Sequence, residues 1–366
     1  MVSVMAHDAP AGAPPAQSDV IIQTQGLTKR FGARVAVDSL DLEVRRGDVF
    51  ALLGPNGSGK TTTLRMLLGL NWPTAGVIRI FGADMMNGSA RQAALRRIGS
   101  VVEQPTFYPY LNGFENLRGV ALFAGLPQDT ATDARIRWTL ETVGLLPRAD
   151  DAYRKYSLGM KQRLGVAAAL LTEPDLVILD EPTNGLDPIG ITEMRGLISA
   201  LRARGITVML STHQLYEAQQ VCNRVAVLQS GKLVAQGAVG ELLSAGRGVL
   251  LGFPTEDGAY RAAQALQEAN LPWAPSGSYV RPEPGTWTPP GGWLLLVSAP
   301  HERAAELNAL LTRADLPPAE VRHYEVSLEQ YFLTLTGASG GASSAGAPAY
   351  QIEAFVSAPV AQGGQS

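Results

Sequence analysis

The chain has 366 residues, of which 46% are apolar, and it carries a formal net charge of -3. This length suggests about two domains, and the apolar content excludes a chain that is disordered throughout. No apolar run approaches the roughly 18 residues of a bilayer-spanning helix, and the N-terminus lacks the features of an export signal, so we expect a cytoplasmic protein. The basic residues are scattered among 33 acidic ones, so composition does not support a nucleic-acid partner.

Both ends of the chain are rich in Ala, Pro and Gly, which predicts disordered tails over residues 1–18 and 338–366. Between them, apolar or β-type segments predict strands at 20–24, 33–44, 49–53, 99–103, 176–179, 206–210, 225–228 and 233–235. Helical spacing follows at 61–70, and a mostly helical stretch runs from Pro105 to about Thr172. Apolar strands separated by helices predict a mainly parallel sheet covered on both faces.

Residues 246–337 have a different character, with 6 basic and 10 acidic residues. The pattern predicts a split β-α-β arrangement of ferredoxin type, with its elements at 249–253, 258–270, near 279, 293–298, 302–314 and 321–326. A last helix is expected from Ser327, which has capping-box spacing, to Gly337. Three tryptophans in this region, Trp273, Trp287 and Trp293, are read as core residues in preference to a ligand site.

A glycine-rich segment follows the apolar strand at 49–53 and precedes the helix at 61–70. Its sequence, Gly54-Pro-Asn-Gly-Ser-Gly-Lys-Thr61, fits the phosphate-loop pattern in the structural context that this pattern requires. Lys60 would reach the β- and γ-phosphates, and Thr61 would bind Mg²⁺. The alternative is a chance glycine turn. The nucleotide-contacting residues predicted here are Gly54, Pro55, Asn56, Gly57, Ser58, Gly59, Lys60, Thr61 and Thr62.

Two acidic residues end the buried strand at 176–179, at the edge where open α/β sheets bind their ligands. Asp180 would hold Mg²⁺ through water, and Glu181 would polarise an attacking water, which predicts a hydrolase. An ordinary strand-loop junction is the alternative interpretation of these two acids.

The segment Tyr156-Ser-Leu-Gly-Met-Lys-Gln-Arg163 precedes an Ala/Leu-rich helix. Ser157 is a natural N-cap, so its hydroxyl, the Gly159 N–H and the helix dipole predict a second anion site, with a plain helix cap as the alternative. The phosphate loop, Gln104, this segment, Asp180-Glu181, the run from Gly185 to Pro188 and His213 occur in an order that resembles the ATP-binding cassette of ABC transporters. The resemblance covers residues 20–243.

The resemblance implies an α/β fold, the cassette form of the P-loop NTPase. It has a mainly parallel sheet with helices, an antiparallel β subdomain and a helical signature subdomain. It assigns residues 19–244 to the cassette and leaves 246–337 as a small α+β accessory domain. In this family two cassettes pair head to tail and trap each ATP·Mg²⁺ between them.

Several side chains take their expected roles from the resemblance alone. Ser157 and Gly159 would contact the γ-phosphate in the partner's site, and Asp187 would lie in the loop that crosses the dimer interface. Gln104 would touch Mg²⁺ and the attacking water, and His213 the γ-phosphate. One further role concerns the adenine base, on which Phe31 would stack unless it is a core residue.

The segments 103–117, 156–164 and 180–188 are similar to exporter ATPases that confer resistance to bacitracin-type or lantibiotic peptides. The resemblance therefore implies an ATP-hydrolysing subunit that dimerises, most simply as a homodimer. It would power export through a separately encoded membrane permease on the inner face of the membrane. The alternatives are a non-transport ABC ATPase that acts on ribosomes or DNA, and a P-loop kinase.

Overall fold

The computed structural model describes residues 19–103, 106–244, 247–269, 277–282, 293–297, 299, 301–325 and 350–353. The predictions for Gln104, Trp273, Trp287, residues 1–18 and the helix from Ser327 therefore lie outside the described residues. The chain divides into two compact units, residues 1–50, 56–211 and 230–233 in one and 51–55, 212–229 and 234–366 in the other. Within the described part of the chain, no helix is both long and apolar enough to cross a membrane.

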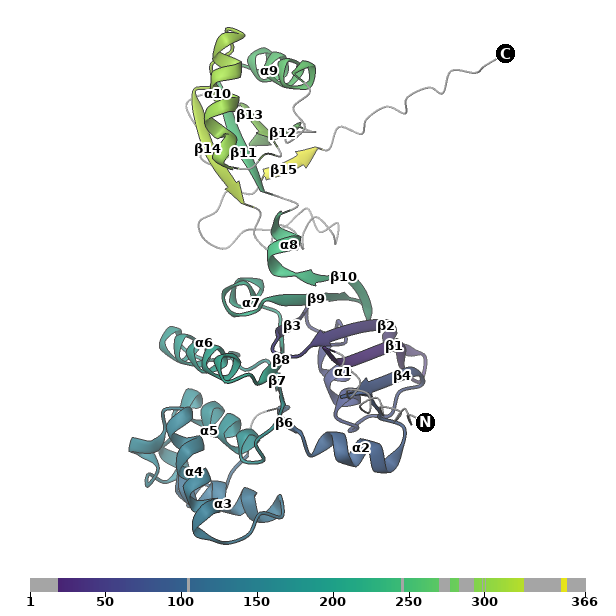
Figure 1. The fold of residues 1–366 in the computed structure, drawn as a ribbon, viewed down its shortest axis with the longest axis vertical. Coiled ribbons are helices and arrows are strands. Elements are labelled where there is room, and N and C mark those ends of the chain that lie inside the picture. The colour runs from purple at the N-terminus through teal and green to yellow at the C-terminus, as the bar shows by residue number, and fades with distance from the viewer. Residues whose placement is uncertain are drawn as a thin grey trace, which may run out of the picture. The chain divides into compact units, whose positions relative to one another are not determined.

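An antiparallel sheet with the order β2-β1-β4-β5 contains the first strands of the chain (Figure 1). Its members are β1 (Val20–Phe31), β2 (Arg34–Arg45), β4 (Ala75–Ile80) and β5 (Ala83–Asp84). Strand β1 continues seven residues beyond the predicted end at Thr24, and its register shifts between Thr24 and Leu27. The shift explains the error, because an irregular strand interrupts the alternation of apolar and polar residues that sequence analysis detects.

A six-stranded sheet has the order β10-β9-β3-β8-β7-β6, and β6, β7 and β8 pair in parallel. Its members are β3 (Val49–Leu53), β6 (Ile98–Val101), β7 (Leu176–Asp180), β8 (Thr207–Thr212), β9 (Arg224–Gln229) and β10 (Lys232–Ala238). All five residues of β3 are buried, as expected for a strand covered on both faces. The predicted strands of this sheet are confirmed, with small shifts at their ends.

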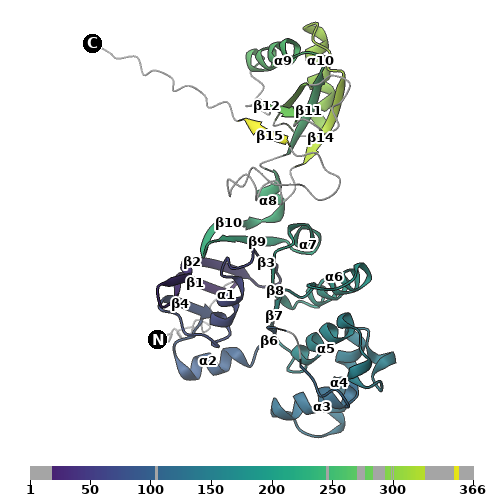
Figure 2. The same cartoon turned by 180° about the vertical axis from the view of Figure 1, so that it is seen from behind.

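The helices of this part of the chain are α1 (Lys60–Leu67), α2 (Gly88–Leu95), α3 (Gly113–Phe123), α4 (Thr130–Thr142), α5 (Leu158–Leu170), α6 (Pro188–Ala203), α7 (Leu215–Val221) and α8 (Val239–Ser244). Two short 3-10 helices lie at Leu146–Arg148 and Tyr153–Lys155. Helices α3, α4 and α5 lie together in both views of the chain (Figures 1 and 2). They form the mostly helical stretch that the sequence predicts. Helix α1 stops at Leu67, three residues before the predicted end.

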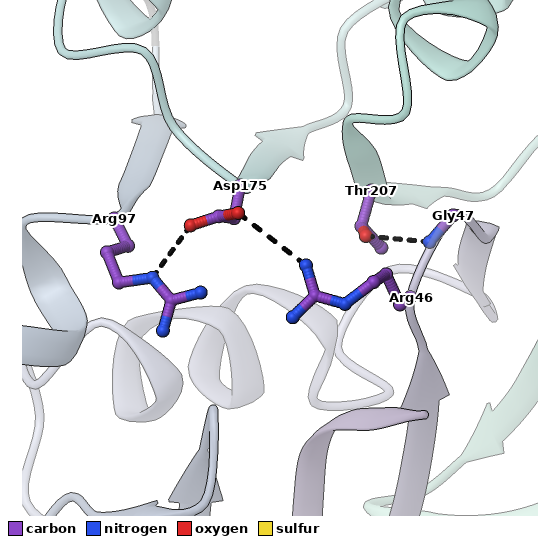
Figure 3. Close-up of polar contacts among 5 residues, drawn as sticks. All are labelled: Arg46, Gly47, Arg97, Asp175 and Thr207. Atoms are coloured by element: carbon purple, nitrogen blue, oxygen red, sulfur yellow. Dashed lines mark hydrogen bonds and ion pairs between the residues drawn. The ribbon is translucent and has the colours of Figure 1, made fainter. Parts of the chain in front are cut away.

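Polar contacts tie together the beginnings of the parallel strands (Figure 3). Asp175, just before β7, accepts a hydrogen bond from Arg97 Nε at 2.7 Å and lies 3.5 Å from Arg46 Nη1. The buried hydroxyl oxygen of Thr207 accepts a hydrogen bond from the Gly47 N–H at 2.9 Å. With their starting ends held in register, β7 and β8 end side by side, which brings Asp180 next to Ser211.

The C-terminal sheet has the order β14-β11-β13-β12-β15 with antiparallel neighbours. Its elements are β11 (Arg247–Phe253), α9 (Glu256–Glu268), β12 (Gly277–Pro282), β13 (Trp293–Val297), a 3-10 helix (His301–Arg303), α10 (Ala304–Arg313), β14 (Glu320–Glu325) and β15 (Tyr350–Glu353). Its core contains Val249, Leu251 and Phe253 of β11 with Leu307 and Leu311 of α10. The first four strands confirm the predicted ferredoxin-type arrangement.

Strand β15 differs from expectation, because it lies within the segment predicted to be a disordered tail. Residues Tyr350–Glu353 instead pair with β12 in an antiparallel register. Tyr350 and Ile352 alternate with polar residues, which is a strand pattern, but the surrounding Ala/Gly-rich sequence conceals so short a segment.

Candidate functional site

The glycine-rich loop connects the buried strand β3 to helix α1, as predicted. Gly59 is the N-cap of α1 and has a φ of 105°, a left-handed conformation that favours glycine. A Cβ built on Gly59 would lie 2.6 Å from the Ala36 carbonyl oxygen, so a side chain is also excluded by contact. No side chain of a described residue caps the N-terminus of α1. The N–H groups of a first helical turn have no partner within the helix, so a helix N-terminus of this kind is a favourable place for an anion.

The loop is held by a neighbouring turn. The Ser58 carbonyl accepts a hydrogen bond from the Gly231 N–H at 3.0 Å, and the Gly231 carbonyl accepts one from the Asp38 N–H at 2.8 Å. The Ser58 hydroxyl is buried and has no hydrogen-bond partner among the described residues. A buried hydroxyl in this state fits a loop that completes its hydrogen bonds with a bound ligand or water.

Lys60 and Glu181 meet at the carboxyl end of β7. Lys60 Nζ lies 3.6 Å from Glu181 Oε1, and the two side chains are 5% and 23% exposed. The structure thus brings together the predicted phosphate-binding lysine and the predicted catalytic acid. Glu181 has a φ of 46°, a conformation that few non-glycine residues adopt and that occurs at functional sites.

Ser211, which sequence analysis did not assign to the site, fixes both acidic residues. Its hydroxyl donates a hydrogen bond to Asp180 Oδ1 and accepts one from the Glu181 N–H at 3.0 Å. Ser211 is fully buried at the end of β8. Its place in the sequence could have revealed this role. Ser211 follows an apolar strand, as Asp180 does, and parallel strands end at the same edge of a sheet.

The predicted second anion site lies at the N-terminus of α5. The Ser157 hydroxyl caps this helix by accepting a hydrogen bond from the Met160 N–H at 3.2 Å. Asp187 similarly caps α6, since its Oδ1 accepts from the Gly190 N–H at 2.9 Å. A Cβ built on Gly159 would lie 3.8 Å from the Gly190 Cα atom, so the two helix N-termini lie close together.

Phe31, at the end of β1, is 50% exposed, which argues against the alternative of a core residue. Lys29 Nζ lies 4.9 Å from the centroid of its ring. His213 directly follows β8 and is exposed. The position of Gln104 cannot be compared with these residues, because it lies outside the described part of the chain.

Comparison with known proteins identifies the family. The ABC transporter family model matches residues 37–184. The bacitracin transport ATP-binding protein BcrA of Bacillus licheniformis is 49% identical over 217 residues, which cover 59% of this chain and 69% of that protein. The BcrA protein of Enterococcus faecalis is 36% identical over 323 residues, covering 88% of this chain and 98% of that protein. The chain belongs to the ATP-binding subunits of ABC transporters.

The ABC cassette fold is also found among solved structures. A dimeric structure of the cassette MJ0796, in a post-hydrolysis state with ADP and Pi, is 25% identical with a TM-score of 0.54 and covers 60% of this chain and 99% of that one. The predicted family, fold class and enzymatic activity are therefore confirmed. This ABC subunit is an ATPase that binds ATP, and cassettes of its family dimerise and work with a membrane permease.

Proposed function

We propose that ATP binds to the loop at 54–62 and is hydrolysed at the carboxyl end of β7, with Glu181 as the general base. The observation that carries the proposal is the contact between Lys60 and Glu181, which places a phosphate-binding cation beside a proton acceptor. Lys60 binds the β- and γ-phosphates, and the backbone N–H groups at Gly59 and the start of α1 bind phosphate oxygens.

The donor atoms at this position fit Mg²⁺, which prefers oxygen ligands such as the Thr61 hydroxyl and the Asp180 carboxylate. The ion neutralises phosphate charge when it is bound. Asp180 is held in place by the hydrogen bond from Ser211, which fixes the position of its carboxylate. Asp180 would hold the ion through a water molecule, and Gln104 would be a further ligand.

The Lys60–Glu181 pair suggests how binding prepares the chemistry. The Glu181 carboxylate is partnered by the Lys60 ammonium. The triphosphate competes for that ammonium, and the weakened ion pair makes the Glu181 carboxylate a better proton acceptor. An attacking water then transfers a proton to Glu181 and forms a bond to the γ-phosphorus, while the bond to the bridging oxygen breaks to release ADP and phosphate.

We further propose that the active form is a homodimer. The capped N-terminus of α5 offers the Gly159 N–H and the Ser157 hydroxyl to the γ-phosphate in the partner's site, and Asp187 lies beside it. His213 contacts the same phosphate, and Phe31 stacks on adenine. The dimeric MJ0796 cassette with ADP and Pi supports this arrangement.

The names of the relatives supply the transport proposal. Because both BcrA proteins are described as bacitracin transport ATP-binding proteins, we propose export of peptide antibiotics through a separate permease, with this subunit on the inner face of the membrane. We also propose that residues 19–244 form the cassette and that 246–337 support dimerisation or regulate it. A truncation after Ser244 that leaves dimerisation, ATPase rate and membrane docking unchanged would contradict the last point.

The catalytic assignment is tested with Glu181→Gln. This variant retains ATP binding, accumulates an ATP-bound dimer in size-exclusion chromatography and loses hydrolysis by at least about a hundredfold, the typical contribution of a general base. Lys60→Ala instead loses ATP binding itself. Undiminished turnover in Glu181→Gln would overturn the role of Glu181 as general base. Glu268→Gln on α9 makes the same change of charge away from the loop sequence and serves as the control, with turnover expected to be unchanged.

The transport assignment is tested by isolating the complex from membranes. A polytopic membrane protein that co-purifies with the chain, and a loss of bacitracin resistance in cells carrying Glu181→Gln, are the expected results. Unchanged resistance would rule out this substrate, and sedimentation with ribosomes would contradict the transport function.

A further inference from the structure

The beginning of β2 runs alongside the phosphate loop. A Cβ built on Gly57 would lie 3.8 Å from Arg34 Nη2, and a Cβ built on Gly59 would lie 2.6 Å from the Ala36 carbonyl oxygen. A step of two residues along the loop thus matches a step of two residues along the strand. This match places the Arg34 guanidinium beside the backbone of Gly57.

Arg34 differs from the cation that the loop itself supplies. Lys60 is buried and paired with Glu181. Arg34 is exposed, and within the described part of the chain its side chain forms no ion pair or hydrogen bond. Its charge is therefore not neutralised by a described neighbour, although it lies beside a loop built to receive an anion.

Arg34 is also next to the predicted base-stacking residue. In the ladder of β1 and β2 it is directly opposite Phe31, so the two side chains share one face of the sheet. A nucleotide whose base lies on Phe31 and whose phosphates lie in the loop must pass this position. A guanidinium suits a phosphate group there, because its planar N–H groups can bind two phosphate oxygens at once.

We propose that Arg34 is a further nucleotide-binding residue, which contacts the phosphate chain of ATP from the β1–β2 turn. The inference rests on the proposed function of the loop at 54–62, since it needs the phosphates to lie there. It assigns two parts of the nucleotide to one turn, the base to Phe31 and the phosphate chain to Arg34.

Binding of three probes to the full chain tests the assignment. Affinities are measured by competition against a fluorescent ATP analogue. Arg34→Gln lowers the affinity for ATP and for inorganic tripolyphosphate by about three- to tenfold, as expected for one partly exposed charge-assisted contact. The affinity for adenosine changes less than twofold, because adenosine has no phosphate. Arg34→Lys retains the charge without the planar fork and gives an intermediate loss.

Arg30 provides a matched control in the same turn. It is exposed and precedes Phe31 by one residue, so its side chain lies on the opposite face of β1. Arg30→Gln removes the same charge and leaves all three affinities unchanged. An equal loss of ATP affinity in both arginine variants would show a general effect of net charge. An equal loss of affinity for adenosine and for ATP in Arg34→Gln would show that Arg34 contacts the base. Either result overturns the proposal.

Lys60→Ala separates this inference from the proposed function. If Lys60→Ala abolishes ATP binding while Arg34→Gln has no effect, the loop binds the phosphates and only the role of Arg34 is wrong. If Lys60→Ala binds ATP normally, the proposed site itself is wrong. Thermal unfolding without nucleotide verifies that every variant is folded, and these exposed arginines are expected to melt as the wild type does.

Discussion

Cys222 is buried at the end of α7, and burial raises the pKa of its thiol from 9.0 to about 12. Below about pH 9 the thiol is protonated in both the folded and the unfolded chain. Above that pH the unfolded chain loses the proton while the folded chain keeps it, so this residue lowers the free energy of unfolding as pH rises toward 12. We expect the thiol to lower the free energy of unfolding by on the order of 1 kcal/mol between pH 8 and pH 10.

Urea unfolding at these two pH values, in the presence of a reducing agent, measures the effect. Cys222→Ala has no thiol, so its stability falls less between pH 8 and pH 10 than that of the wild type. If the two proteins lose the same free energy over this interval, the thiol is not responsible.

At the scale of residues, the sequence predicted those parts of the site that are contiguous in the chain. The phosphate loop and Asp180-Glu181 are each one short segment whose chemistry follows from local context. Ser211 and Arg34 were not predicted, because they reach the site only through strand pairing. Ser211 comes from the strand beside β7, and Arg34 comes from β2, which precedes the loop in the chain and is separated from it by β3.

At the scale of elements, glycines define where a helix can approach a strand. A Cβ built on Gly99 in β6 would lie 2.2 Å from the Ala169 carbonyl oxygen in α5. The carbonyl belongs to the backbone of α5, which cannot move aside as a flexible side chain can. We therefore expect Gly99→Ala to lower the free energy of unfolding by about 1 to 3 kcal/mol, the usual cost of overpacking.

Gly196 in α6 is the matched control for this substitution. It is exposed, and apart from its chain neighbours and the adjacent backbone of its own helix, no heavy atom of the described chain lies within 4 Å of a Cβ built there. Alanine at this helical position removes backbone freedom from the unfolded state, so Gly196→Ala should stabilise the chain by about 0.5 to 1 kcal/mol. Effects of the same sign in the two variants, measured by urea unfolding, would contradict this account of β6 and α5.

Elements were predicted well where their pattern was continuous and poorly where it was interrupted. The parallel strands and the ferredoxin-type strands were found within a few residues, because burial on one or both faces imposes a clear pattern. Strand β4 was not predicted, since its first two residues, Ala75 and Gly76, end the segment 71–76, which has the Pro and Gly of a helix-breaking turn. In the folded chain a Cβ at Gly76 would lie 2.4 Å from the Gly26 carbonyl oxygen, so this glycine permits the close approach of β4 to β1.

At the scale of the whole molecule, the proposed dimer requires that the N-terminus of α5 act on a second copy. Ser157 has a local role as a helix cap, so a loss of function in Ser157→Ala could reflect damage to the helix alone. Aspartate is as good an N-cap as serine, and its charge suits the helix dipole. Ser157→Asp thus preserves α5 and places a negative charge where the partner's γ-phosphate is proposed to bind.

We expect Ser157→Asp, combined with Glu181→Gln, to bind ATP with unchanged affinity but to remain monomeric in size-exclusion chromatography with light scattering. The phosphate loop that binds ATP belongs to the same copy, whereas the added carboxylate repels the phosphate of the other copy. Thr255→Asp, the same kind of cap replacement at the start of α9, should leave the dimer intact. An ATP-dependent dimer in the Ser157→Asp protein would show that this helix end does not face a phosphate, and the composite site would have to be abandoned.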